Sequence, residues 1–222
     1  MNTNYTAVSR PSLSALEANK VLKNTYLLLS ATLAFSAVMA VVSMAINVPP
    51  MAYIISLIAS MVLGIFVLPK AANSSAGIGV IFLITGLLGF GLGSILSIYM
   101  AMSNGPQVVA TALGGTGIIF LGLSGYALTS KKDFSFLGGF LFAGMMVVLL
   151  AIIASLFIQM PALSLTISAA VIMLMSGFIL FDTSRIINGG ETNYIMATYG
   201  IFLSIFNIFI SQFNILGIMG DD

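Results

Sequence analysis

An acidic residue inside an apolar run, Asp182, is the first candidate for chemistry in this chain. Apolar residues continue beyond it, so we expect its helix to continue too and to hold Asp182 about one turn inside a membrane boundary. Arg185 follows three residues later on the same helix face. An acid in a membrane helix is a functional candidate because removing a carboxylate from water is costly. Two interpretations remain: an interfacial ion pair with Arg185, or a protonation-sensitive latch or ion ligand.

A stripe of polar residues follows on the last apolar run. Ser204, Asn207, Ser211 and Asn214 are spaced by three, four and three residues, which places them on one helix face. Such a stripe either joins helices by hydrogen bonds or borders a pathway. Asp182 is also the candidate metal ligand. The predicted pH latch comprises Asp182, Arg185, Ser204 and Asn207.

The absence of His and Cys from the sequence excludes most enzyme chemistry. It removes the usual zinc ligands, the common general base near neutral pH and every Ser-His or Cys-His arrangement. Residues 122–125 have the GxSG form of intramembrane serine proteases, but Ser124 has no His to activate it. Asp182 alone cannot supply the two facing aspartates of an aspartyl protease. We therefore expect no enzymatic activity and no cofactor.

Charged residues are few and fall mostly between the apolar runs. The densest group is 131–133, comprising Lys131, Lys132 and Asp133, and Asp133 is predicted to cap the following helix. Glu191 stands before the last apolar run and could serve the start of that helix. The predicted cytoplasmic contact residues are Lys20, Lys23, Lys131, Lys132, Asp133 and Glu191.

The elements that must position these residues are membrane-spanning helices. Of the 222 residues, 59% are hydrophobic and 6% charged, with a mean hydropathy of +1.15, whereas a soluble domain is about a quarter charged. Helix breakers, Pro69 and Pro161 among them, separate apolar runs of about 20 residues, the length that crosses a bilayer. We predict an all-α bundle of seven spans between an N-terminal polar tail, 1–24, and a short C-terminal tail, 220–222. The spans are placed at about 25–46, 51–68, 78–100, 108–128, 134–157, 162–181 and 194–219.

The basic residues predict the orientation of the bundle. Every Lys and Arg falls before the first span or after an even-numbered one, which by the positive-inside rule places these segments in the cytoplasm. An odd number of spans then puts Asp221 and Asp222 on the far side. The net charge of +1, without a basic cluster, argues against nucleic acid as a partner. Glycines in the third to fifth spans, such as Gly89, Gly93 and Gly122, predict close helix packing.

Several stretches carry a family resemblance, namely residues 19–26, 32–36, 132–139 and 189–195. They resemble the Bax inhibitor-1 (transmembrane Bax inhibitor motif) family over essentially the whole chain, and in particular a branch of bacterial inner-membrane proteins. The resemblance implies a seven-helix fold with the seventh helix central. For that branch it implies an interaction with the FtsH membrane protease and its associated membrane proteins, as a slow substrate that also restrains the protease. The N-terminal tail of this chain is similar to the tail by which FtsH grasps members of that branch.

Other bacterial members of the family look like pH-sensitive calcium leak channels. The resemblance assigns them an aspartate on helix six paired with one on helix seven, with a glutamate on helix two. Asp182 matches the first position, but Ser204 aligns with the second and residues 51–68 contain no acid. A lone carboxylate offers little to Ca²⁺, which prefers several oxygen ligands. A calcium or cation leak near Asp182 is therefore the alternative to FtsH modulation.

Overall fold

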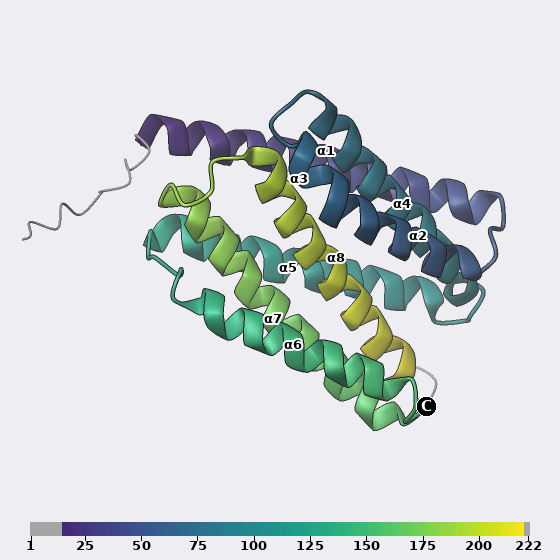
Figure 1. Ribbon diagram of the computed structural model, residues 1–222. Helices are drawn as coiled ribbons and strands as arrows, with labels where there is room; N and C mark the ends of the chain where they lie inside the picture. The colour runs from purple at the N-terminus through teal and green to yellow at the C-terminus, as the bar shows by residue number, and fades with distance from the viewer. Residues whose placement is uncertain (1–14, 220–222) are drawn as a thin grey trace, which may run out of the picture.

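The protein is an all-helical bundle, shown as a computed structural model that describes residues 15–219 (Figure 1). Seven continuous helices in this part of the chain are long and apolar enough to cross a membrane, as predicted. Helices α2 and α3 and the π-helical segment η1 between them form one of these spans. The elements are α1 (Ala15–Ala45), α2 (Met51–Val62), η1 (Leu63–Val67), α3 (Leu68–Ala71), α4 (Ala76–Met100), α5 (Gly105–Ser130), α6 (Leu137–Ser155), α7 (Pro161–Ile187) and α8 (Tyr194–Met219).

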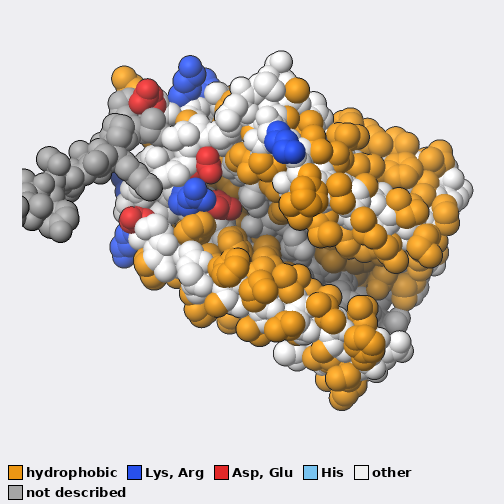
Figure 2. Space-filling view, in the orientation of Figure 1, with side chains coloured by type: hydrophobic (Ala, Val, Ile, Leu, Met, Phe, Trp, Pro, Cys, Tyr) orange, Lys and Arg blue, Asp and Glu red, His pale blue; other side chains and the backbone are white. Residues whose placement is uncertain are grey.

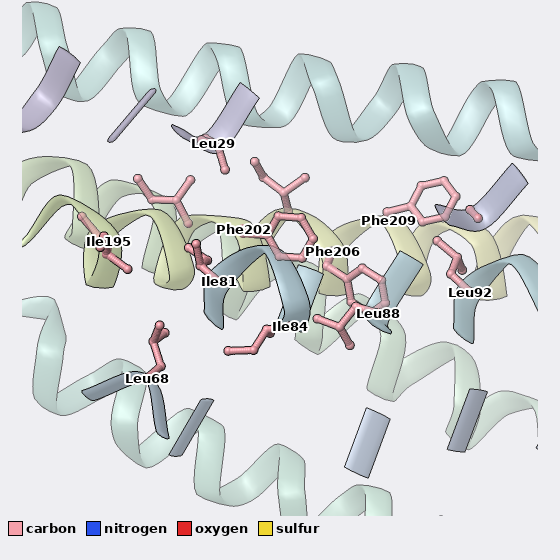
Figure 3. Close-up of a cluster of buried hydrophobic side chains, with 14 of the residues drawn as sticks. Leu29, Leu68, Ile81, Ile84, Leu88, Leu92, Ile195, Phe202, Phe206 and Phe209 are labelled. Atoms are coloured by element: carbon pink, nitrogen blue, oxygen red, sulfur yellow. The ribbon is translucent and has the colours of Figure 1, made fainter. Parts of the chain in front are cut away.

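Helix α8 is the centre of the bundle. It contacts α1, α4, α5 and α7, and with α4 it is the most buried of the spans. Figure 1 shows it between α1, α2 and α4 on one side and α6 and α7 on the other. Phe202, Phe206 and Phe209 of α8 pack with Leu88 and Leu92 of α4 in the larger hydrophobic core (Figure 3). The expected central position of the last helix is confirmed.

Close approach of α1 to α4 depends on glycine. A Cβ added at Gly89 would collide with the backbone of Ser36, and one at Gly93 with the backbone of Ala40. These glycines confirm the predicted close packing of small residues. On α5 the prediction is wrong for Gly122 and for three other glycines, because a Cβ there would meet nothing within 4 Å; the other three are Gly114, Gly117 and Gly125.

Several helix boundaries differ from those expected, as three examples show. Helix α1 begins at Ala15, so residues 15–24 of the predicted tail are helical, while residues 1–14 and 220–222 lie outside the described part of the chain. Pro69 does not end the second span, because η1 widens the turn before it and the backbone N–H of Leu68 bonds to the carbonyl of Leu63. Helix α6 begins later than expected, at Leu137.

Candidate functional site

Asp182 lies inside α7, which continues past it to Ile187 as predicted. The side chain is partly buried and faces α8 at Gly200, where an added Cβ would lie 2.8 Å from Oδ2 of Asp182. Within residues 15–219 the carboxylate makes no hydrogen bond or ion pair. Gly200 therefore provides the space that this carboxylate occupies between the two helices.

Arg185 does not form the interfacial ion pair with Asp182 that was one of the two interpretations. Its Nη2 lies 3.5 Å from Oε2 of Glu191 and donates to the carbonyl of Gly190 at 3.2 Å, while the guanidinium lies 5.4 Å from the centre of the Phe181 ring. The loop after α7 competes successfully for this cation because its carboxylate and carbonyl converge on one side of Arg185. The Glu191 side chain is 22% exposed and that of Arg185 37%, so solvent weakens the ion pair.

The polar stripe on α8 divides into two halves. Ser204 and Asn207 donate to backbone carbonyls of their own helix, those of Gly200 and Leu203. Farther along, Nδ2 of Asn214 donates to the hydroxyl oxygens of two serines on α7, Ser164 at 2.8 Å and Ser168 at 2.9 Å. Hydrogen bonding between helices is thus confirmed for Asn214. The predicted contact of Asp182 with Ser204 and Asn207 is not formed as a hydrogen bond among the residues described.

The charged side chains gather at one end of the bundle, which Figure 2 shows beside the N-terminal start of α1. We call this the charged end; it comprises the start of α1 and the loops 72–75, 131–136 and 188–193. Lys20, Lys23, Lys131 and Lys132 are exposed there. The loops at the opposite, uncharged end, 46–50, 101–104 and 156–160, contain no Lys, Arg, Asp or Glu. The predicted contact residues therefore share one surface.

The loop 131–136 is held to α7 by Ser184, which the sequence did not single out. The Ser184 hydroxyl accepts from the backbone N–H of Phe134 at 2.8 Å and donates to the carbonyl of Lys132 at 3.1 Å. Asp133 was predicted to cap the next helix, and this is wrong, since the first turn of α6 has no side-chain cap. Its Oδ1 accepts from the backbone N–H of Ser135 at 2.8 Å instead, and this bond lowers the pKa of Asp133.

The loops 72–75 and 188–193 are joined by Asn193, the second residue that the sequence did not single out. Oδ1 of Asn193 accepts from the backbone N–H groups of Ile195 and Met196 at the start of α8. Its Nδ2 donates to the carbonyl of Ala72 and to Oδ1 of Asn73. Glu191 contributes indirectly, because its Oε1 accepts from the backbone N–H of Asn193. An Asn just before an apolar run is a helix-start signal that could have identified the cap but not its partners.

The described residues contain neither a cluster of metal ligands nor a serine paired with a base. No group of three or more His, Cys, Asp or Glu side chains comes together between residues 15 and 219. Ser124 of the GxSG stretch is buried, and its hydroxyl has no hydrogen-bond partner among the residues described. A serine hydroxyl without a base is a weak nucleophile.

Seven apolar spans, of which α8 is the central one, with charges at one end, define a polytopic helical membrane protein. The chain belongs to the family described as inhibitor of apoptosis-promoting Bax1, whose model matches residues 18–221. The family predicted from the sequence is confirmed.

Bacterial relatives match along nearly the whole chain. The chain is 52% identical over 207 residues to an uncharacterized membrane protein of Vibrio cholerae, covering 93% of both chains. It is 49% identical over 209 residues to a protein of Escherichia coli K12 named modulator of FtsH protease YccA, covering 94% of both. The same identity and coverage hold for a protein of Escherichia coli O6:H1 named inner membrane protein YccA. These names describe a modulator and a membrane protein, not an enzyme.

Proposed function

We propose that this chain is a non-enzymatic inner-membrane protein that binds an FtsH-type membrane protease, restrains it and is itself degraded slowly by it. The observation that carries the proposal is the 49% identity, over 94% of both chains, to the protein named modulator of FtsH protease YccA. Membrane proteins that associate with the protease are further partners under this proposal, and no cofactor is required.

The charged end is the contact surface under this proposal. Every charged side chain in the described part of the chain lies at or near this end, while the rest of the visible surface is mainly apolar (Figure 2). A water-soluble protease domain beside the membrane can reach only what projects from the bilayer. The exposed Lys20, Lys23, Lys131 and Lys132 supply a basic rim on this end, with Asp133 among them.

Helix α1 is long enough to project a segment from the membrane that the protease can grasp, and we call this segment the handle. Its 31 residues extend about 46 Å at 1.5 Å per residue, whereas the hydrocarbon core of a bilayer is about 30 Å thick. Its first turns, with Glu17, Lys20 and Lys23, therefore project beyond the core at the charged end. Under the positive-inside rule this end is cytoplasmic and the C-terminus lies on the periplasmic side.

The proposed contact is tested by deleting residues 1 to about 20. This deletion removes the start of the chain and part of the projecting turns. Co-purification with FtsH and the degradation rate of an FtsH membrane substrate are measured in cells with wild-type or truncated protein. We expect the truncated chain to insert normally, lose FtsH and no longer slow degradation. The matched control replaces exposed Ser103 at the uncharged end with Ala. Full coupling in the truncated protein would refute the handle, and absence of FtsH from the wild-type purification would refute the proposed function.

A second candidate function is a pH-sensitive calcium or cation leak near Asp182. It is favoured by the unpaired carboxylate of Asp182 against Gly200 and by the polar stripe, which starts one turn farther along α8. The stretch from Gly200 to Asn214, which contains the stripe, extends about 21 Å along the helix. It would connect the charged end with the uncharged end.

Calcium flux into proteoliposomes distinguishes the two functions. Wild type and Asp182→Asn are compared between about pH 6 and pH 8, a window that a buried carboxyl can reach. A pH-dependent flux that the substitution abolishes would support the leak, while FtsH co-purification should be unaffected. Flux no greater than in empty liposomes would rule out the leak and leave protease modulation as the function.

A further inference from the structure

A polar pocket occupies the uncharged end of the bundle, far from the charged end and from Asp182. It has a volume of about 300 Å³ and is lined by residues of α2, α4, α6, α7 and α8. The lining residues of α2, α4, α6 and α7 lie near the ends of their helices that join the loops 46–50, 101–104 and 156–160, and those of α8 lie in its last ten residues. Its polar lining comes chiefly from Tyr53, Tyr99, Ser164, Ser168, Ser211 and Asn214.

Several of these side chains have unused hydrogen-bonding capacity. Ser211 is only 6% exposed, yet its hydroxyl makes no hydrogen bond with any described residue. The phenol groups of Tyr53 and Tyr99 and the Oδ1 of Asn214, which belong to partly buried side chains, also have no partner within residues 15–219. Buried polar groups in native proteins are nearly always satisfied, by protein or by water. Their convergence on one pocket therefore indicates that something polar fills it.

Asn214 gives the pocket a fixed shape. By donating to Ser164 and Ser168 of α7, its amide holds both serine oxygens at one wall and leaves their hydroxyl hydrogens free to donate elsewhere. Phe213 contacts Tyr99 in a tilted arrangement with ring centroids 4.4 Å apart, and these two rings give the pocket an aromatic wall. The walls thus combine hydrogen-bonding groups with flat aromatic faces.

The chemistry of the lining selects an uncharged occupant. None of the lining residues is Lys, Arg, Asp or Glu. An anion would find no cationic partner, and a cation would find no carboxylate, so either would lose its hydration without compensation. A molecule with hydroxyl or amide groups can both donate and accept, which matches serine, tyrosine and asparagine. Its apolar faces can pack on Tyr53, Tyr99 and Phe213.

We propose that this pocket is a hydrated binding site for a small uncharged molecule rich in hydroxyl groups. Its volume corresponds to about ten water molecules at ~30 Å³ each, which leaves room for a monosaccharide. Its position on the opposite end from the proposed FtsH contact makes this site independent of the proposed protease function. The polyol can come from solution or from the uncharged glycerol head of a membrane lipid.

Single cysteines test the pocket, because the native chain contains none. Ser211→Cys and Ser168→Cys are made in the full chain, reconstituted in phospholipid nanodiscs free of sugar detergents, and labelled with N-ethylmaleimide. The matched control is Ser94→Cys, since Ser94 is 1% exposed in the packed α4 and its hydroxyl already bonds to the carbonyl of Gly91. We expect both pocket cysteines to react at least about tenfold faster than the control, because a thiolate forms in water and not in an apolar core. Equal rates would refute the hydrated pocket.

Protection from labelling tests the ligand class. Glucose at about 100 mM should slow labelling of Ser211→Cys about tenfold if its dissociation constant is ten times lower. Sodium acetate and choline chloride at the same concentration should have no effect. Nanodiscs with monoacylglycerol, which keeps two free hydroxyls, should show the same protection without glucose if the source is a lipid. Lack of protection by both glucose and monoacylglycerol, or equal protection by the charged probes, would overturn the proposal. Unchanged melting temperatures of the variants verify that they are folded.

Discussion

Single polar residues organise the charged end, and Asn193 is the clearest example. One side chain caps α8 through its Oδ1 and holds the loop before α4 through its Nδ2. The two functions use different atoms of the same amide. Substitutions can therefore separate them.

We expect Asn193→Ala to destabilise the protein by about 1–3 kcal/mol, because it removes a helix cap and leaves the carbonyl of Ala72 without this donor. Asn193→Asp keeps two acceptor oxygens for the cap but cannot donate to Ala72 or Asn73, so its cost should come from the loop alone. Unfolding monitored by circular dichroism in detergent gives the stabilities. Hydrogen exchange should show a loosened loop 72–75 in both variants and a frayed start of α8 only in Asn193→Ala. Fraying in both would contradict this division.

At the scale of elements, the glycines of α4 and α5 have opposite surroundings. Gly93 lies where α1 and α4 touch, and a Cβ there would meet the backbone carbonyl of Ala40, which cannot move aside without moving the helix. Gly122 on α5 has nothing within 4 Å of the same position. Because both glycines lie inside helices, replacing each of them with Ala isolates the effect of the contact made by the added Cβ.

Gly93→Ala should therefore cost about 1–3 kcal/mol through overpacking. Gly122→Ala should be neutral or stabilising by up to about 1 kcal/mol, because alanine is the better helix former. Equilibrium unfolding in mixed micelles measures both. A similar loss in the two variants would mean that the glycines act through helix flexibility and not through packing.

Apolar runs predicted the helices well because membrane spans are specified by length and hydropathy alone. The predicted last span, 194–219, has the same two ends as α8, Tyr194 and Met219. Partners across the sequence could not be predicted in this way. In the sequence both Asp182 and Glu191 are near enough to Arg185 to pair with it. Only the folded loop after α7 shows that Glu191 is the partner. The pocket at the uncharged end likewise combines Tyr53 with Asn214, residues that no local pattern connects.

Within residues 15–219 the molecule has one charged and one uncharged end, and the apolar band between them matches a bilayer. Helices such as α8, with 26 residues, extend about 39 Å at 1.5 Å per residue. This exceeds the hydrocarbon core of about 30 Å by about 9 Å, less than two helical turns, shared between both ends. Charge asymmetry thus leaves two possible orientations, and the positive-inside rule selects one of them.

Labelling of single cysteines in spheroplasts tests that orientation, since the native chain has no Cys of its own that could react. Ser74→Cys places an exposed thiol in loop 72–75 of the charged end, and Ser103→Cys places one in loop 101–104 of the uncharged end. If the charged end is cytoplasmic, an impermeant maleimide added to spheroplasts should label Ser103→Cys at once and Ser74→Cys only after the membrane is permeabilised. The reverse pattern would place the basic rim outside the cell, where the cytoplasmic contact surface proposed for an FtsH-type protease could not operate.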